Sequence, residues 1–346
     1  PIMKKFLALM LSLALVFALA ACGQKDTGDS NTGDSSNTDA SADWPKANTR
    51  YIITASAGGG LDICARMLAP YWEKATDNKT VVTVENVTGG ANWIGWTEMF
   101  NATPDGSTVA NIHTPQVFSY LNKALQNSNT LDSFNLLCNC VTDSVTIAVR
   151  NDDSRFADVN TLDDLANMLK SASSDFTVAL TSKGGADELA LLEFCDQAGV
   201  TNLIGINHSD GISAQKTSFL SGDCDLYFGK VGDTLTMYEE GTVKVLAVCK
   251  ADRSSFLPDI ATASEQGYEI IQGSDRGIVT QPGVPEEIKE AMVASLRAAQ
   301  EDPEYLAAME AAGYEVNYMD GEEYEQYMKD QEAVIIKWAD ELGYNG

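Results

Sequence analysis

The stretch YIITASAGGGLD at residues 51–62 decides the fold, because a β-branched run ends in a glycine-rich turn that opens a helix. Glycine permits positive φ and close approach of a ligand to the backbone, and the first amide groups of a helix attract anions. The stretch has neither the lysine of GxxxxGK[ST] nor the spacing of GxGxxG, so it does not predict a nucleotide site. Taken alone, it is equally typical of a tight structural turn.

Two further glycine turns follow strand-like runs, ENVTGGAN at residues 85–92 and SKGGA at residues 182–186. Open α/β sheets bind their ligands at the carboxyl ends of strands, where such turns meet helix N-termini. The three turns together therefore predict an anion site more firmly than any one of them does.

Short β-branched runs alternate with helical patterns along the chain, which favours an α/β fold with largely parallel sheets. The expected strands are 51–54, 81–84, 108–112, 145–149, 176–180, 203–206, 225–228 and 243–248. Helices are expected after Thr161 in a capping box with Asp164, from Asp187 to Gly199, from Pro285, and from Asp320 to the C-terminus. About three hundred residues from Trp44 onward exceed what one core usually supports, so two lobes are expected.

Composition excludes several function classes. The chain has 23 basic and 50 acidic residues, a net charge of −27, which argues against a nucleic-acid partner. With two histidines and no HExxH, CxxC or GxSxG motif, the sequence predicts no catalytic residues, no metal and no cofactor. Six cysteines beyond Cys22 match no zinc spacing; Cys138 and Cys140 are not expected to pair with each other, and other disulfides stay open.

The N-terminus reads as an export signal. Lys4 and Lys5 precede an apolar run, and residues 19–22 (LAAC) form a lipoprotein cleavage site with Cys22 as the lipidated residue. A transmembrane helix is the alternative, but the run is shorter than the roughly 20 residues that a span requires. Residues 1–22 are thus a predicted signal peptide, and the polar residues 23–43 a disordered tether to the membrane of a Gram-positive-type cell.

From Trp44 to its end the sequence resembles the solute receptors of tripartite tricarboxylate transporters, the Bug-type binding proteins. The resemblance rests on matching segments along the chain: WP at 44–45, AGGG at 57–60 with AR at 65–66, VEN at 84–86, GAN at 90–92, PDG at 104–106, FLSGDCD at 219–225, LPD at 257–259, EQG at 265–267 and PGVP at 282–285. It implies a type II periplasmic-binding-protein clamshell with a ligand cleft between two lobes. We expect residues 44–143 plus 252–346 in one lobe and 144–251 in the other.

The resemblance also implies that the first and third turns hold a carboxylate. We assign its binding to the turns containing Ala57, Gly58 and Gly59, and Ser182, Gly184, Gly185 and Ala186, with Asp62 ordering the first loop and Thr114 adding a hydroxyl. Leu61 stands where the family usually has threonine. Lys230 is either a partner for a second carboxylate or a surface lysine, and we interpret Arg276 as structural, paired with Asp275 or Asp62.

The predicted function is a monomeric, lipid-anchored extracytoplasmic protein that captures a small carboxylate and delivers it to membrane permease subunits. A ligand sensor that presents its closed form to a receptor kinase is the alternative. An extracellular enzyme is the third interpretation, and it would turn its bound ligand over. Which acid is bound does not follow from the sequence.

Overall fold

A computed structural model describes residues 44–208 and 210–345, all within the folded unit Ala42–Gly346. The predictions for the signal peptide, Cys22 and the tether lie outside the described residues. No helix in the described part of the chain is long and apolar enough to cross a membrane.

A mixed sheet of ten strands organises the described residues. The strands are β1 (Asn48–Ile53), β2 (Val81–Asn86), β3 (Thr108–His113), β4 (Asn135–Arg150), β5 (Phe176–Leu180), β6 (Leu203–Asn207), β7 (Leu226–Lys230), β8 (Val243–Val248), β9 (Gly273–Thr280) and β10 (Val316–Asp320). Their order is β2-β1-β3-β9-β4-β7-β5-β6, and β10 and β8 both pair with β4 outside this path. The predicted α/β class is confirmed.

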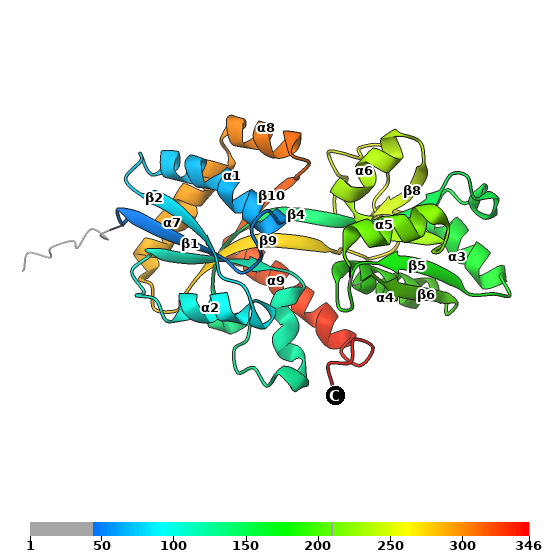
Figure 1. The fold of residues 1–346 in the computed structure, drawn as a ribbon, viewed down its shortest axis with the longest axis horizontal. Helices are drawn as coiled ribbons and strands as arrows, with labels where there is room; N and C mark the ends of the chain where they lie inside the picture. The colour runs from blue at the N-terminus through cyan, green and yellow to red at the C-terminus, as the bar shows by residue number, and fades with distance from the viewer. Residues whose placement is uncertain (1–43, 209, 346) are drawn as a thin grey trace, which may run out of the picture. The chain divides into compact units, whose positions relative to one another are not determined.

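Strand β4 divides this sheet into two sections. Its residues 135–144 pair with β9, and its residues 145–150 pair with β7 and β8. We call β1, β2, β3, β9, β10 and the first part of β4 the first section, and β5, β6, β7, β8 and the rest of β4 the second section. Figure 1 shows β4 and β9 running from one section toward the other.

Helices cover both faces of both sections. They are α1 (Gly60–Ala75), α2 (Trp93–Phe100), α3 (Leu162–Ser171), α4 (Ala186–Ala198), α5 (Ile212–Ser221), α6 (Val231–Glu239), α7 (Glu286–Gln300), α8 (Pro303–Ala311) and α9 (Gly321–Lys337). The expected capping box forms, with Thr161 accepting from the Asp164 amide at 3.1 Å. Gly199 ends α4 in the left-handed conformation, as predicted.

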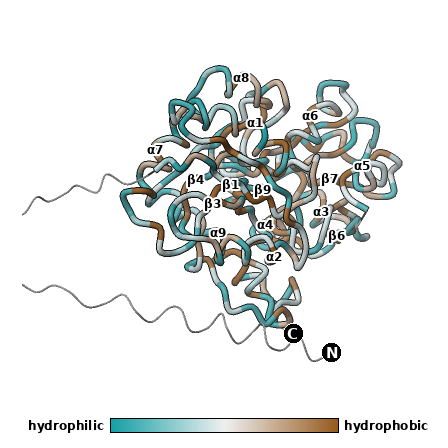
Figure 2. The backbone as a smooth tube through the Cα atoms, turned by 60° about the vertical axis from the view of Figure 1, so that its left-hand side comes forward, coloured by the Kyte–Doolittle hydropathy of each residue, from teal (hydrophilic) through white to brown (hydrophobic). Residues whose placement is uncertain are grey.

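Apolar side chains between the sheet and these helices form the cores. In the first section, α1, α7 and α8 pack on one face and α2 and α9 on the other. In the second, α3 and α4 pack on one face and α5 and α6 on the other. The hydrophobic stretches in Figure 2 accordingly run through the interior strands, and most of the outer loops are hydrophilic.

Residues 252–272 pack differently from the expected lobe assignment. Leu257 belongs to the core under α5 and α6, and Ala263, Tyr268 and Ile270 belong to the core under α3 and α4. Thr262 also bridges to Val248 at the end of β8. This segment therefore packs with the second section, although we had placed residues from 252 onward with the first.

The strand register determines where the carboxyl ends lie. His113, the last residue of β3, pairs with Arg276 near the start of β9, and β1 and β2 run parallel to β3. Lys230, the last residue of β7, pairs with Val145, and β5 and β6 run parallel to β7. The carboxyl ends of β1, β2 and β3 therefore point toward the second section, and those of β5, β6 and β7 toward the first.

A buried carboxyl group joins α4 to the residue before β9. Gln272 donates to Glu193 at 2.9 Å, and burial raises the pKa of Glu193 from 4.5 to about 7. Because the folded pKa lies above the unfolded one, the protonated group's stabilisation is complete below pH 4.5 and is lost as the pH rises through 7. Glu193→Gln should therefore remove part of the loss in unfolding free energy between pH 5 and 8, measured by urea titration.

The matched control is Glu240→Gln, an exposed position at the end of α6. It should leave the pH dependence of stability unchanged. An identical pH dependence in wild type and Glu193→Gln would contradict the assignment.

Candidate functional site

The first glycine turn is ordered by a buried carboxylate. Asp62, 3% exposed, accepts the Gly58 amide at 2.9 Å and the Asn86 side-chain amide at 3.0 Å. Arg66 donates to the same carboxylate at 3.0 Å and also reaches Asn86. Hydrogen bonds from Arg66, followed by the Gly58 amide, lower the pKa of Asp62 against the opposing effect of burial. Asp62 thus links the turn to the end of β2.

This turn leaves several backbone donors open. The Gly58 and Gly59 amides are engaged, by Asp62 and by the Ser56 carbonyl. Helix α1 has Gly59 as its N-cap and no side-chain cap. Within residues 44–208 and 210–345, the amides of Ala57, Gly60 and Leu61 have no acceptor. The donors available to an anion therefore lie on both sides of Gly58 and Gly59, at Ala57 and at the first residues of α1.

The third glycine turn also binds its own amides to nearby acceptors, but other parts of the protein cover it. The Gly184 amide donates to Glu188 at 2.5 Å, and the Gly185 amide to the Ser182 carbonyl at 3.2 Å. Gly185 is the N-cap of α4, which has no side-chain cap, and the Ala186 amide has no acceptor in the described chain. Both Gly185 and Ala186 are buried.

The segment after α9 provides that cover. The Tyr344 hydroxyl lies 3.1 Å from the point where a Cβ on Gly184 would sit. The Tyr344 carbonyl accepts from Lys123 at 2.9 Å, which ties the segment to the first section. The amine of Lys183, in the same glycine turn, lies 3.5 Å from the point where a Cβ on Gly343 would sit. The end of the chain therefore contacts the predicted ligand turn of the second section.

At the second glycine turn an isoleucine side chain lies against the two glycines. Gly89 and Gly90 have positive φ, and the Ile94 side chain lies 2.8 and 3.2 Å from the points where their Cβ atoms would sit. Ile94 is nevertheless 54% exposed. This turn thus presents an apolar side chain as well as its backbone.

The structure places Thr114 and Lys230 at the ends of β3 and β7. The Thr114 hydroxyl, in a side chain 1% exposed, donates to Asp275 at 2.5 Å, and Tyr327 donates to the same carboxylate at 2.9 Å. The hydroxyl that we predicted for the ligand is therefore directed into the protein. Lys230 is half-buried and forms the N-cap of α6.

Arg276 has a different partner from the two that we expected. Its guanidinium lies 3.4 Å from Asp143, 3.3 Å from the Cys64 sulfur and over the Tyr314 ring. Asp275 points to the other face of β9, because successive residues of a strand alternate in direction. The Arg276 guanidinium also lies 3.0 Å from the point where a Cβ on Gly60 would sit, beside the open amides of α1.

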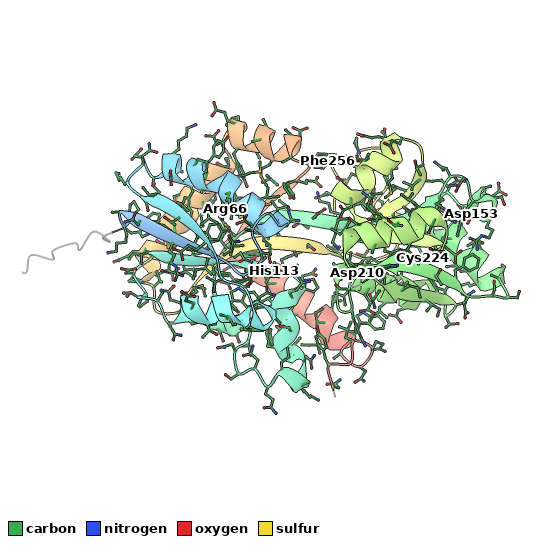
Figure 3. All side chains as sticks on the ribbon, viewed as in Figure 1. Arg66, His113, Asp153, Asp210, Cys224 and Phe256 are labelled. Carbon is green, nitrogen blue, oxygen red and sulfur yellow. The ribbon has the colours of Figure 1, made fainter. Side chains whose placement is uncertain are left out.

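Two titratable side chains near Arg276, His113 and Asp143, have shifted pKa values. Burial, followed by the charge of Arg276, lowers the pKa of His113 to about 4, so the imidazole is neutral near pH 7. Burial raises the pKa of Asp143 against the opposing charge of Arg276. Figure 3 labels His113 on the first section and Asp210, after β6, on the second, at ends that face each other.

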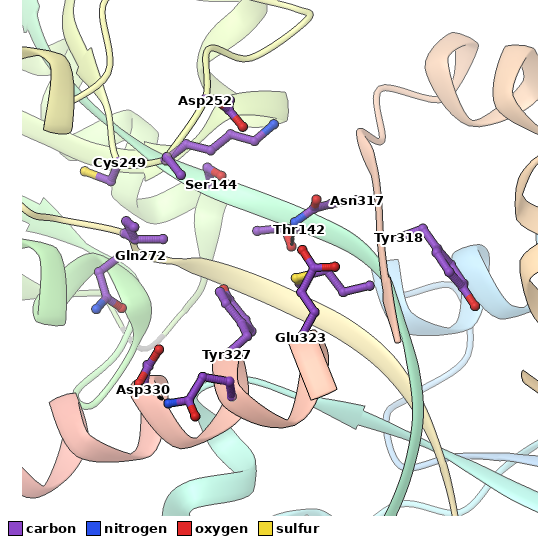
Figure 4. Close-up of a pocket in the computed structure, with 15 residues that line it drawn as sticks. Thr142, Ser144, Cys249, Asp252, Gln272, Asn317, Tyr318, Glu323, Tyr327 and Asp330 are labelled. Atoms are coloured by element: carbon purple, nitrogen blue, oxygen red, sulfur yellow. Dashed lines mark hydrogen bonds between the residues drawn. The ribbon is translucent and has the colours of Figure 1, made fainter. Parts of the chain in front are cut away.

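A cavity of about 440 Å³ lies elsewhere, between α9, β10 and the segment after β8. Its lining includes Thr142 and Ser144 of β4, Gln272, and Tyr327 and Asp330 of α9, and Figure 4 shows these side chains around it. None of the predicted ligand residues lines it. Strands β8 and β10 pair with β4 outside the path that carries β1, β2, β5 and β6. The cavity is therefore separate from the glycine turns.

Sequence reasoning missed the proximity of Arg276, Asp143 and Tyr344 to the turns. Asp143 and Arg276 are 133 positions apart and Tyr344 is 160 positions from Gly184, so no local pattern reports these contacts. The described cysteines are all free, and no cluster able to hold a metal occurs among the described residues.

Comparison with known proteins identifies relatives along most of the chain. The model of a family described as "Tripartite tricarboxylate transporter family receptor" matches residues 65–342. A UPF0065 protein from Cupriavidus necator is 25% identical over 308 residues, which cover 86% of this chain and 90% of that protein.

Solved structures share the fold at lower identity. A TctC solute-binding protein from Polaromonas without ligand matches with a TM-score of 0.77 and 24% identity over 85% of this chain and 99% of that one. An R. palustris protein with adipate matches with a TM-score of 0.64, 18% identity and coverages of 87% and 99%. MatC from Rhodopseudomonas palustris with bound malate matches with a TM-score of 0.59, 19% identity and coverages of 85% and 99%.

Proposed function

The chain belongs to the tripartite tricarboxylate transporter receptor family, and from that premise we propose that it captures a small carboxylate and delivers it to membrane permease subunits. The family and fold are those of extracytoplasmic solute-binding receptors, which are not enzymes. Two relatives of this fold were solved with malate and with adipate, which supports a carboxylate as the ligand class here.

One observation carries the proposal. Helix α1 follows the carboxyl end of β1, which points toward the second section, and α4 follows the carboxyl end of β5, which points toward the first section. Neither helix has a side-chain N-cap. Open first-turn amides and the positive end of the helix dipole together favour an anion. The net charge of −27 gives no general attraction for an anion, so such local donors must supply it.

The site we propose consists of the two outer turns. The amides of Ala57, Gly60, Leu61 and Ala186 hold the carboxylate, and Asp62 fixes the first turn. Gly58, Gly59, Ser182, Gly184 and Gly185 shape the backbone, because their own amides or carbonyls are largely engaged within the turns. Movement of the segment at Tyr344 gives the ligand access to the third turn.

The two sections act as lobes in this proposal. Residues 44–143 with 273–346 form one lobe and residues 144–272 the other, a boundary drawn from the packing of Leu257 and Ile270. A ligand that contacts both turns favours closure by its higher affinity for the closed form. Lipidation at Cys22 and the polar tether hold a monomer at the membrane, next to the permease.

A thermal-shift screen of small acids tests the proposal. A carboxylate at 100 times its dissociation constant should add about 2.7 kcal/mol to the unfolding free energy. Matched amides of the same acids are the controls, because they lack the negative charge. The proposal fails if no small carboxylate stabilises the protein, or if amide and acid stabilise it equally. Mass spectrometry of eluted ligand should show it chemically unaltered.

A further inference from the structure

The cavity of about 440 Å³ beside α9 has walls from both sections of the sheet. Residues 317–319 of β10 and one face of α9 belong to the first section, and residues 249–252 and 271–272 pack with the second. Strand β4 contributes Thr142 and Ser144, at the point where it passes from one section to the other. The volume suits a small organic molecule, and a molecule bound here contacts both sections.

A buried hydroxyl group in this cavity wall has no hydrogen-bond partner. Ser144 is 1% exposed, and within residues 44–208 and 210–345 nothing bonds to its Oγ. Thr142 and Ser144 are two positions apart in β4, so both side chains lie on the strand face that lines the cavity. The Thr142 hydroxyl donates to Asp275 at 2.6 Å. An unpaired buried hydroxyl is costly, so the Ser144 Oγ marks a position for a hydrogen-bonding ligand.

The charge of the cavity lining is negative. Asp252, Glu323 and Asp330 line the cavity at exposed positions, and none of them forms an ion pair with another described residue. Lys250 also lines it, but its amine lies 2.8 Å from the Glu315 carboxylate. A cavity lined by uncompensated charges of one sign concentrates ions of the opposite sign. The lining therefore favours a cation.

Two of the three carboxylates lie at opposite ends of one face of α9. This helix lines the cavity with Glu323, Gln326, Tyr327 and Asp330, which are spaced as neighbours on a single helix face. At 1.5 Å per residue, the first and last of them are separated by about 10 Å along the axis. The Tyr327 ring lies between them, and Figure 4 shows it and Glu323 projecting from α9 toward β4. Aromatic surface thus separates the two negative charges.

This separation decides between a metal ion and an organic cation. Among the described residues, no group of three acidic, histidine or cysteine side chains is placed to hold a metal ion. Separate carboxylates with a ring between them match a molecule that has two cationic ends and a hydrocarbon middle. Each ammonium group brings three hydrogen-bond donors, and an aromatic face attracts it further.

We propose that this cavity binds a linear organic diamine. One ammonium group pairs with Glu323 and the other with Asp330, the hydrocarbon chain lies against Tyr327, and the Ser144 hydroxyl accepts from one ammonium group. None of the residues assigned to the carboxylate lines the cavity. The site is therefore independent of the proposed carboxylate function.

Titration calorimetry with heptane-1,7-diamine tests the site. The buffer contains salt at about 0.15 M, which screens the general attraction of a chain with a net charge of −27 for any cation. Heptylamine has the same chain and one ammonium group, and propane-1,3-diamine has two ammonium groups that are too close together. Each should bind about fivefold more weakly than heptane-1,7-diamine, because each leaves one carboxylate unpaired. Equal affinity for the three amines, or no binding of heptane-1,7-diamine, overturns the proposal.

Three variants and a control locate the binding. Glu323→Gln and Asp330→Asn should each weaken heptane-1,7-diamine binding by about fivefold. Ser144→Ala should also weaken it without lowering the melting temperature of the free protein, because no hydrogen bond is lost.

The control is Asp175→Asn, which removes the same charge at an exposed position just before β5 and should bind the diamine as wild type does. Melting curves of the free proteins check that each variant is folded. Wild-type affinity in a folded Glu323→Gln, Asp330→Asn double variant, or an equal loss in the control, overturns the proposal.

Discussion

Replacing Asp62 with alanine should abolish measurable carboxylate binding and lower the free energy of unfolding by about 2–3 kcal/mol. The carboxylate is 3% exposed and accepts hydrogen bonds from Gly58, Asn86 and Arg66. Its removal leaves these donors without their acceptor, and each such loss costs about 1–3 kcal/mol before the loop relaxes. The relaxed turn no longer aligns the amides of α1. Calorimetry and urea unfolding measure the two effects.

Two further variants separate the loop from general charge effects. Asp175→Ala removes an exposed carboxylate just before β5, and it should change neither binding nor stability measurably. Asp62→Asn keeps one acceptor oxygen and should retain the fold with weakened binding. If Asp62→Ala is folded and binds the carboxylate with wild-type affinity, the first turn is not part of the site.

Replacing Trp72 with alanine should destabilise the protein by about 3–5 kcal/mol. The indole is fully buried on α1, stacks edge-to-face with Tyr51 of β1 and donates to Ser295 of α7 at 2.8 Å. Alanine leaves a cavity between α1, β1 and α7 and removes the donor to Ser295, whose hydroxyl still donates to the Met292 carbonyl. Because α1 carries the open amides, loss of this packing should also weaken ligand binding.

Urea unfolding measures the loss in unfolding free energy. Circular dichroism is used as its signal, because it does not depend on tryptophan fluorescence. Trp72→Phe keeps most of the apolar contact and should cost less than half as much. Leu306→Ala, at a 41% exposed position on α8, is the surface control and should change stability by less than about 0.5 kcal/mol. A Trp72→Ala variant as stable as the Leu306→Ala control would contradict the packing described for α1.

Much of the fold follows from local patterns in the sequence. The expected strands at 176–180 and 243–248 match β5 and β8, and the Thr161 and Asp320 signals locate the starts of α3 and α9. These elements were predictable because their apolar periodicity and end signals lie within a few residues of each other. The family match also confirms the resemblance found in the sequence.

The first part of β4, and the whole of β9 and β10, were not among the predicted strands. The first part of β4, together with β9 and β10, contains Asn139, Thr142, Asp275 and Arg276, which break the apolar pattern of a strand. These polar groups are satisfied by distant partners, as when Thr142 and Thr114 both donate to Asp275. Tertiary contacts of this kind leave no trace in a local window.

The glycine turns of the proposed site could be predicted from the sequence, but the backbone amides that they leave open could not. The glycine pattern located the helix starts after Gly59 and Gly185. Which amides are free depends on acceptors such as Asp62 and Glu188, whose side-chain directions no spacing rule gives. The cover provided by Tyr344 depends on where the end of the chain returns, which is a property of the whole fold.

Amide hydrogen exchange with and without a stabilising carboxylate tests the central claim most directly. We predict added protection at residues 57–62 and 184–188, which include the open first-turn amides of α1 and α4, and little change at residues 317–330 around the separate cavity. Protection confined to residues 317–330, or no change at either turn while the ligand is bound, would contradict the account.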